Sequence, residues 1–319
     1  MSKRAAKNTG DGDARKAAVA RKAGAKGRKA DMKGRDAAGA QAIYVYCVGE
    51  RAALAPLFDD ELPGAIEGES VLELAGEGLA AVVSRVPLAD YGEEALPSRL
   101  ADAAWTATRA LRHERVVEHF ARRAAVVPLR FGTIYLRRES VERMLVERDA
   151  QLRSVLARLE GREEWGLNLS VERARLREEV AHVSPRLREM VERAEGSPPG
   201  RAYLLRKKIE ALRDEEARAE TRRVASEVES RLAKACDGAA RLRVLKDEAT
   251  EQGELAARFA FLVARRRFDE FRRAAERLAE EGAPRGFRFE LTGPWPAYNF
   301  AREENTEGGK GEEGERGKG

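Results

Sequence analysis

Two histidine–carboxylate pairs come first, because imidazole and carboxylate groups at helical spacing can hold a metal ion. His113-Glu114 and Glu118-His119 lie in one helix-like segment. A zinc-binding His-Glu-x-x-His motif needs two imidazoles four residues apart on one helical face. His119 follows His113 by six residues, which is about 240° around an α-helix. We therefore expect no metal site here, and the sequence predicts no cofactor.

A glycine pattern after a short apolar run is the second candidate. Gly76, Gly78 and Ala81 have the G-x-G-x-x-A spacing, which binds dinucleotides only where a helix begins at the third small residue. The residues that follow are strand-like and end at a proline. We therefore reject a nucleotide site and predict a β-hairpin from Ser70–Ala75 and Leu79–Val86.

Other reactive groups are sparse. Cys47 and Cys236 lie far apart, so they form neither a metal-ligand motif nor a disulfide framework, which fits a reducing cytoplasm. Arg130 sits within an apolar run, where it would clamp a carboxylate or phosphate, form a structural ion pair or lie exposed at a sheet edge. No paired catalytic groups are found, so we predict that the protein is not an enzyme.

The elements around these residues follow from hydrophobic pattern. Ala125–Tyr135 predicts a buried strand with a bend at Gly132, placed at a sheet edge because Pro128 has no N–H to donate. Ala42–Val48 is apolar on both faces and predicts a central strand. Helices are predicted for Ser98–Arg123 and for Ser140–Leu159, with the two serines as N-caps and Gly161 ending the second helix. Leu100, Ala104, Ala107, Leu111 and Val117 or Phe120 form the expected apolar stripe of the first helix.

The second half repeats a strand and helix order. Glu164–Val171 alternates, which places Trp165, Leu167, Leu169 and Val171 on one face of a strand. Residues 172–194 and 201–236 predict an antiparallel coiled-coil hairpin, joined by a loop of glycine, serine and proline. The later elements are strands Arg241–Lys246, Ala257–Ala264 and Gly286–Leu291, with a helix over Phe268–Glu281.

This order predicts an α+β protein with two domains of ferredoxin-like (split βαβ) character, the second carrying the helical hairpin. The domains are expected over residues 41–161 and 162–300, with the hairpin over about 172–236. Residues 301–319, rich in glycine and glutamate, are expected to be disordered. No transmembrane segment or secretory signal is predicted.

The N-terminal segment differs from the rest in charge. Residues 1–40 hold 12 Lys/Arg against 4 Asp/Glu, whereas the later residues hold 48 basic and 51 acidic side chains. The segment lacks aromatic residues and is expected to be a disordered basic tail, whose deletion leaves folding intact. It could bind nucleic acid weakly and without sequence preference. A nucleic-acid-associated protein is therefore the alternative function.

Four motifs resemble one protein family. They are Val127-Pro128-Leu129-Arg130-Phe131-Gly132, Glu164-Trp165-Gly166, Gly200-Arg201-Ala202-Tyr203-Leu204 and Leu291-Thr-Gly293-Pro294-Trp295-Pro296-Ala-Tyr298-Asn-Phe300. In this order they resemble the GvpL/GvpF family of gas vesicle proteins over about residues 42–300. The resemblance implies a non-enzymatic accessory or minor structural protein, needed to assemble the gas vesicle shell. It also implies contact with the shell protein and other accessory proteins, and no small-molecule substrate or membrane partner.

The candidate interaction or structural residues are those of the motifs. They are Pro128, Arg130, Phe131, Gly132, Trp165, Tyr203, Leu204, Gly293, Pro294, Trp295, Pro296, Tyr298 and Phe300. The two prolines around Trp295 stiffen the last motif, whose aromatic rings suit either docking between the domains or presentation to a partner. Polyproline geometry repeats every three residues, so Trp295 and Tyr298 are predicted to lie on one side of the segment.

Overall fold

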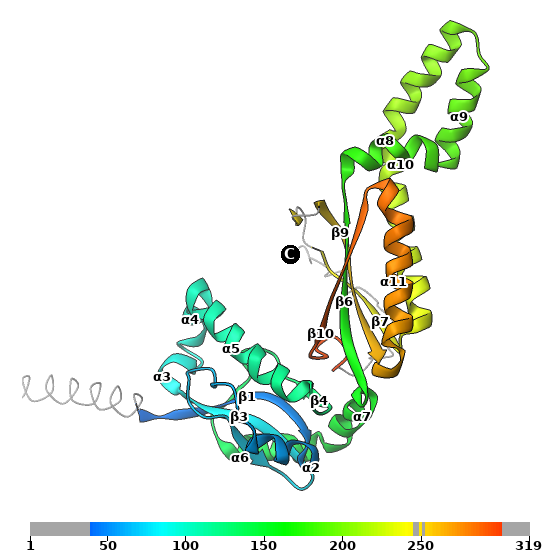
Figure 1. Cartoon of the computed structure of the whole chain (residues 1–319). Coiled ribbons are helices and arrows are strands. Elements are labelled where there is room, and N and C mark those ends of the chain that lie inside the picture. Colours follow the sequence, from blue (N-terminus) through cyan, green and yellow to red (C-terminus); the bar gives the residue numbers. More distant parts are fainter. Residues whose placement is uncertain (1–38, 245–248, 251–252, 302–319) are drawn as a thin grey trace, which may run out of the picture.

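The computed structural model describes residues 39–244, 249–250 and 253–301. The structure is mixed α/β. Its main features are two five-stranded antiparallel sheets, the helices that pack on them and one long helix. Figure 1 shows the first sheet with its helices at the bottom and the second sheet standing beside it, with a helical hairpin beyond its far end. The predictions of disorder for residues 1–38 and 302–319, and of strand at Lys246, lie outside the described residues.

The first sheet has the strand order β2-β3-β1-β4. Its strands are β1 (Gln41–Glu50), β2 (Leu72–Ala75), β3 (Leu79–Pro87), β4 (Val126–Pro128) and β5 (Ile134–Tyr135). β1 pairs with β3 on one side and with β4 and β5 on the other, so the predicted central strand is confirmed. β2 and β3 form the predicted hairpin, and no helix follows its glycine turn. β4 lies at the sheet edge, as the proline predicted.

Helices cover both faces of this sheet. They are α2 (Arg51–Leu54), η1 (Ala55–Asp59), α3 (Leu88–Tyr91), α4 (Leu96–Ala101), α5 (Ala103–Ala121), α6 (Arg138–Glu147) and α7 (Asp149–Leu159). Tyr44 and Tyr46 of β1 belong to the core cluster on the α5 face, whereas Val45 and Val48 belong to the cluster with α6 and α7. Burial on both faces explains why β1 is a continuous apolar run.

Three helix predictions are wrong in detail. Ser98 lies inside α4, and the N-cap of α5 is Asp102, whose carboxylate accepts hydrogen bonds from the N–H groups of Ala104 and Trp105. The predicted stripe residue Leu111 is exposed, because the break at Asp102 starts a new helix with a different buried face. The predicted helix over Ser140–Leu159 is two helices that meet at Arg148, and Ser140 is not its N-cap. Gly161 follows α7 with a left-handed φ of 67°, as expected for a helix end.

The second sheet has the strand order β10-β6-β9-β7. Its strands are β6 (Arg162–Val171), β7 (Gly238–Leu242), β8 (Ala249–Thr250), β9 (Gly253–Ala264) and β10 (Phe287–Trp295). Trp165, Leu167, Leu169 and Val171 all contribute to one core cluster, so the predicted common face is confirmed. That cluster packs against α10 (Pro199–Leu232) and α11 (Phe268–Gly282). Three short 3-10 helices connect these helices to the strands. They are η2 (Ala233–Ala235) before β7, η3 (Arg265–Arg267) after β9 and η4 (Ala283–Arg285) before β10.

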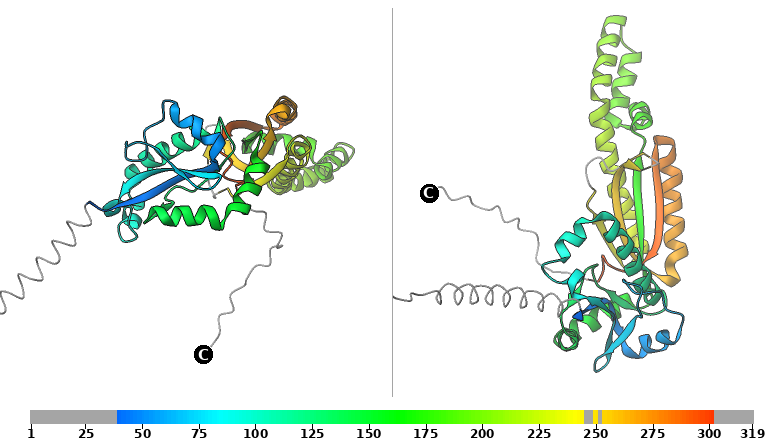
Figure 2. Two further views of the ribbon diagram at one scale, coloured as in Figure 1. Left: turned by 90° about the horizontal axis from the view of Figure 1, so that it is seen from below. Right: turned by 90° about the vertical axis from the view of Figure 1, so that its left-hand side faces the viewer.

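The opposite face of the second sheet is polar. Asn168 of β6 donates a hydrogen bond from Nδ2 to Glu290 Oε2 at 3.1 Å, and its Oδ1 accepts one from Arg258 Nε at 3.2 Å. These three side chains lie across neighbouring strands in register. The helices of this half of the chain cover only the apolar face, as both views in Figure 2 show.

The helical hairpin is shorter than predicted. Residues 172–194 form two helices, α8 (Arg173–Val183) and α9 (Pro185–Glu195), because Ser184 and Pro185 stop the first and cap the second. Only α9 and the first part of α10 project, held by a small cluster that includes Val180, Leu187 and Ile209. The later part of α10 packs on the second sheet. Figure 2 shows the projecting pair at the far end of the molecule.

We propose that Gly161 divides the described chain into two domains. The strands of the first sheet all precede it, and those of the second all follow it. The core clusters follow the same division except at the joint, where Leu262 of β9 packs with the cluster on the α6–α7 face.

Candidate functional site at the joint between the two sheets

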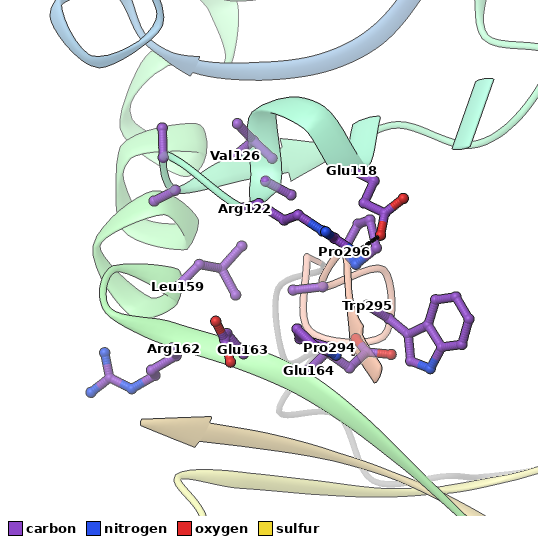
Figure 3. Close-up of a pocket in the computed structure, with 14 residues that line it drawn as sticks. Glu118, Arg122, Val126, Leu159, Arg162, Glu163, Glu164, Pro294, Trp295 and Pro296 are labelled. Carbon is purple, nitrogen blue, oxygen red and sulfur yellow. Dashed lines mark hydrogen bonds and ion pairs between the residues drawn. The ribbon is translucent and has the colours of Figure 1, made fainter. Parts of the chain in front are cut away.

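Residues 293–301 form a strap that runs from β10 to the first sheet. The strap begins at a cis peptide between Gly293 and Pro294, next to an irregularity in the pairing of β10 with β6. Gly293 has φ of 125°, and a Cβ there would lie 3.1 Å from the Glu164 carbonyl oxygen. Only glycine suits that backbone conformation and that close approach. Figure 3 shows the strap residues Pro294–Pro296 beside Glu164 and the end of α5.

Tyr298 anchors the strap in the first sheet. Its Oη lies 3.1 Å from Nε2 of His113 and donates to Glu114 Oε2 at 3.1 Å. His113 is buried in α5, and its Nδ1 lies 2.9 Å from Oη of Tyr44. Tyr44 Oη in turn accepts a hydrogen bond from the N–H of Gly132 at 3.0 Å. The strap thus completes a buried chain of hydrogen bonds that starts in β1.

One arrangement of protons satisfies every group of this chain. A neutral His113 with its proton on Nε2 donates to Tyr298, while Tyr44 donates to Nδ1 and accepts from Gly132. Burial lowers the pKa of His113 to about 4, which favours this neutral form. Burial also raises the pKa of Glu114 and the pKa of Tyr298. These groups act as a structural network, because their hydrogen-bonding capacity is used within the protein.

Glu164 holds the strap from the second sheet. Its two carboxylate oxygens accept hydrogen bonds from Asn299, one from the backbone N–H at 3.0 Å and one from Nδ2 at 2.5 Å. The Glu164 side chain is almost fully buried. Burial raises the pKa of Glu164, and the two hydrogen bonds from Asn299 oppose that shift. The neighbouring residues Tyr298 and Asn299 therefore connect His113 of α5, which packs on the first sheet, with Glu164 of β6 in the second sheet.

Phe300 fills the remaining space at the joint. It packs with the cluster that contains Leu159 and Leu262, one from each side of Gly161. A Cβ on Gly238 would lie 3.0 Å from its ring, so β7 approaches Phe300 closely. The carbonyl oxygen of Phe300 accepts a hydrogen bond from Arg158 Nη2 at 2.6 Å. The strap is thus bound by apolar packing as well as by polar contacts.

Trp295 has a different environment from Tyr298. Its side chain is 49% exposed, and its Nε1 donates to Thr292 Oγ1 at 3.2 Å. Figure 3 shows the indole pointing away from the cavity at the joint. The prediction that Trp295 and Tyr298 lie on one side is wrong. The chain turns after Pro296, where the N–H of Tyr298 bonds the Pro296 carbonyl at 2.7 Å, so polyproline periodicity ends there.

The cavity at the joint is small. It has a volume of about 40 Å³ and lies between the end of α5, the start of β6 and the strap, which leaves room for no more than a few water molecules. Arg122 and Glu118 form an ion pair at its rim. The joint is therefore suited to holding two sheets together rather than to enclosing a substrate.

The motif around Pro128 supports the same joint. Pro128 is buried in β4 opposite Cys47, and Phe131 packs beside Tyr44 and His113. Gly132 has φ of 83°, which lets its N–H point at Tyr44. Arg130 is exposed in the turn between β4 and β5, so the predicted continuous strand is wrong, and Arg130 takes the exposed position that was one of its three alternatives. Phe131 and Gly132 meet the strap through the Tyr44–His113 pair.

The other predicted site residues lie elsewhere. Trp165 stacks on Phe268 with 4.1 Å between ring centroids and belongs to the core of the second sheet. Tyr203 and Leu204 lie in the first turns of α10, at the far end of the hairpin, with 65% and 66% of their side chains exposed. The motifs therefore divide into a joint and a distant exposed pair.

Sequence reasoning missed the most connected residues of the joint. The sequence suggests only a metal-ligand role for His113, and Glu164 and Asn299 lie within the family motifs but not among the candidate residues. His113, Val116, Val117 and Phe120 are the buried residues of α5, and their spacing of three and four residues is the signal that marks His113 as buried. No local pattern reveals Glu164, because its partner Asn299 is 135 residues away.

Two other kinds of site are absent from the described residues. No cluster of three or more His, Cys, Asp or Glu residues there could hold a metal ion. Within the same residues, no helix is both long and apolar enough to cross a membrane.

Comparison with known proteins shows the family to which the chain belongs. The model of the gas vesicle synthesis protein GvpL/GvpF family matches residues 42–302, and the chain belongs to that family. Gas vesicle protein L of Streptomyces sp. (strain CB03234) is 32% identical over 268 residues, which covers 81% of this chain and 92% of that protein. Gas vesicle protein L1 of Halobacterium salinarum is 28% identical over 180 residues, covering 55% of this chain and 63% of the relative.

Two crystal structures share the fold. Gas vesicle protein GvpF from Microcystis aeruginosa has a TM-score of 0.57 and 18% identity, with 82% of this chain and 99% of that chain covered. GvpF from Anabaena sp. PCC7120 has a TM-score of 0.57 and 16% identity, with 85% and 100% covered.

Proposed function

We propose that this protein assists assembly of the gas vesicle shell through protein–protein contacts and without catalysis. Family membership supports a gas vesicle role. The observation that carries the contact mechanism is the exposed pair Tyr203 and Leu204 at the far end of the hairpin. Two neighbouring large apolar side chains on a projecting surface are typical of a protein contact site.

The hairpin has the shape of a presenting arm. Its long helix α10 has 34 residues, or about 51 Å at the rise of an α-helix. One end packs on the second sheet, and the other carries the exposed pair. Arg201, Arg206 and Lys207, which flank the pair, are exposed as well. An apolar contact with a cationic rim favours a partner that offers an apolar patch beside carboxylates.

The joint has a separate role in this proposal. The strap fixes the two sheets through Tyr298, Asn299 and Phe300, so the arm has a defined direction relative to the first sheet. We propose the gas vesicle shell protein or another accessory protein as the partner, at the gas vesicle.

We also propose that both sheets follow the split βαβ plan. The order β10-β6-β9-β7 supports this for the second sheet. With the short β8 left aside, these are the fourth, first, third and second strands along the chain, which is the order of the split βαβ plan. The order β4-β1-β3-β2 supports it for the first sheet in the same way. A long arm inserted between the first and second strands is then an addition to a common scaffold.

A double substitution tests the arm. Tyr203→Ser with Leu204→Ser is expected to abolish or strongly reduce vesicle formation in cells that lack the native copy, scored by electron microscopy. The variant is expected to unfold at the wild-type temperature, because both side chains are exposed.

A matched control separates contact from general polarity. Leu136→Ser with Val146→Ser removes two side chains that are 66% and 67% exposed. Leu136 lies just before α6, and Val146 lies on α6, which packs on the first sheet. This variant is expected to form vesicles normally. Wild-type vesicle numbers from the Tyr203 and Leu204 variant would refute the arm as the contact surface.

A further inference from the structure

A groove lies at the base of the arm, away from the joint. It is bounded by α8, by the middle of α10 and by the start of β9, and its cavity volume is about 570 Å³. Sites for small organic molecules have volumes of this order. Its accessible apolar surface comes from Ala174, which is exposed, and from Ala217 and Ala256, which are half-buried. Val171, Leu176 and Leu255 also belong to the lining but are almost fully buried. The groove therefore has an apolar floor.

Ion pairs hold the walls of the groove in place. Arg177 of α8 bonds Asp214 of α10 through Nε at 3.0 Å, and Arg173 of α8 pairs with Glu254 of β9. Arg213 of α10 also donates to the Arg177 carbonyl at 2.8 Å. These contacts connect α8 to both of the other walls. They also neutralise the two arginines of α8 that line the groove.

Two further arginines line the groove without such a partner. Arg218 and Arg222 are four residues apart on α10, so they lie on one face of the helix. In the described part of the chain, neither guanidinium forms an ion pair with a carboxylate. Both side chains are exposed at the groove. The lining therefore combines an apolar floor with two uncompensated cations.

We propose that this groove binds an organic anion with an apolar body. Guanidinium groups recognise carboxylate, sulfonate and phosphate oxygens through paired N–H donors. The acidic group of the ligand pairs with Arg218 and Arg222, and its hydrocarbon part packs against Ala174, Ala217 and Ala256. A simple inorganic anion lacks the apolar part, and an organic cation meets the wrong charge. This ligand site is independent of the partner contact proposed for Tyr203 and Leu204.

Calorimetric titration of the full chain with decanoate tests the site. We expect saturable binding of one decanoate per chain, and no binding of decyltrimethylammonium, which has the same tail and the opposite charge. Arg218→Ala with Arg222→Ala is expected to weaken decanoate binding about tenfold, through the loss of charge-assisted hydrogen bonds. Arg273→Ala with Arg277→Ala is the charge-matched control, because these exposed arginines have the same spacing on α11, outside the groove.

A second pair of variants tests the apolar part. Ala174 is exposed and lines the groove, whereas Glu179 is exposed on the same helix and does not. Ala174→Trp is expected to block decanoate while leaving both arginines in place, and Glu179→Trp is expected to bind it normally. No saturable binding to the wild type, equal binding of the cationic probe, or full binding by both groove variants would overturn the proposal. Thermal unfolding of each variant shows that it is folded.

Discussion

The two sheets have the same strand order but differ in how many of their faces are covered. The first sheet lies between α5 on one face and α6 with α7 on the other. The second has α10 and α11 on one face, and Asn168, Arg258 and Glu290 on the other. The difference is visible in β1, which is apolar from Ala42 to Val48, and in β6, where apolar residues alternate with others from Trp165 to Val171. β1 and β6 are the first strands of their sheets. Covering both faces of a sheet favours a continuous apolar run, whereas covering one face favours alternation of apolar and polar residues.

The strongest test of this difference is a carboxylate placed in each central strand. Val45→Asp in β1 is expected to lower the free energy of unfolding by about 3 kcal/mol or more, because it buries an unpaired charge. Asn168→Asp in β6 is expected to change it by less than about 1 kcal/mol, because the site is half-buried and the attraction of Arg258 offsets the repulsion by Glu290. Urea unfolding of both variants measures the contrast. Similar losses would mean that the polar face of the second sheet is covered in solution.

The strap provides the next contrast, between a docked ring and an exposed one. Tyr298→Ala is expected to cost about 3 kcal/mol, because the ring packs against the first sheet and bonds His113 and Glu114. Trp295→Ala is expected to cost about 1 kcal/mol, because half of its side chain is already exposed. Equal losses in urea unfolding would contradict the separation of the two rings. Loss of vesicles by a stable Trp295 variant would instead add Trp295 to the contact surface.

Acid acts with opposite sign on the buried histidine and on the buried carboxyl groups of the joint. The pKa of His113 is about 4 in the folded protein, below its ordinary value of about 6.5. The stability from neutral His113 is therefore full above pH 6.5 and is lost as pH falls toward 4. The pKa values of Glu114 and Glu164 are raised by burial, so these groups favour the folded state as pH falls.

A neutral replacement isolates the histidine. The difference in unfolding free energy between wild type and His113→Gln is expected to shrink below pH 6.5, by at most about 1.4 kcal/mol per pH unit. Urea unfolding at pH 7, 6 and 5 measures it, with His182→Gln at an exposed site on α8 as the control. A difference that stays constant with pH would show that folding leaves the pKa of His113 unchanged.

The smallest expected effects are in the turn between β4 and β5. Arg130→Ala is expected to change stability by less than about 0.5 kcal/mol, because its side chain is exposed. Gly132→Ala is expected to cost about 1 kcal/mol, because φ is 83° there. Thermal unfolding of the two variants ranks them. A larger loss from Arg130→Ala would indicate that Arg130 forms a structural ion pair in solution.

The type of an element, strand or helix, could be predicted wherever the spacing of its apolar residues was regular. The run in β1, the alternation in β6 and the helix α11 were all predicted because side-chain period reports burial. Helix breaks at Asp102, Arg148 and Ser184 were missed, since apolar spacing continues across them. The buried face of α5 was misplaced for that reason.

The joint was only partly predictable. The resemblance directed attention to Tyr298, Phe300 and Gly132, but not to the groups that they bond. His113 and Tyr298 are 185 residues apart, and no spacing rule links residues at that distance. Which aromatic ring docks and which lies exposed depends on the turn after Pro296, a local conformation that the polyproline expectation did not include.

The position of the strap in the chain has a consequence for biosynthesis. Tyr298 bonds His113 of α5 only after the ribosome has made both sheets and the whole hairpin. Until then the imidazole of His113 and the carboxylate of Glu164 lack their strap partners. A chain that ends between Trp295 and Tyr298 contains the strands of both sheets without the tie between them. It also lacks the Phe300 ring that packs on the cluster around Leu159 and Leu262.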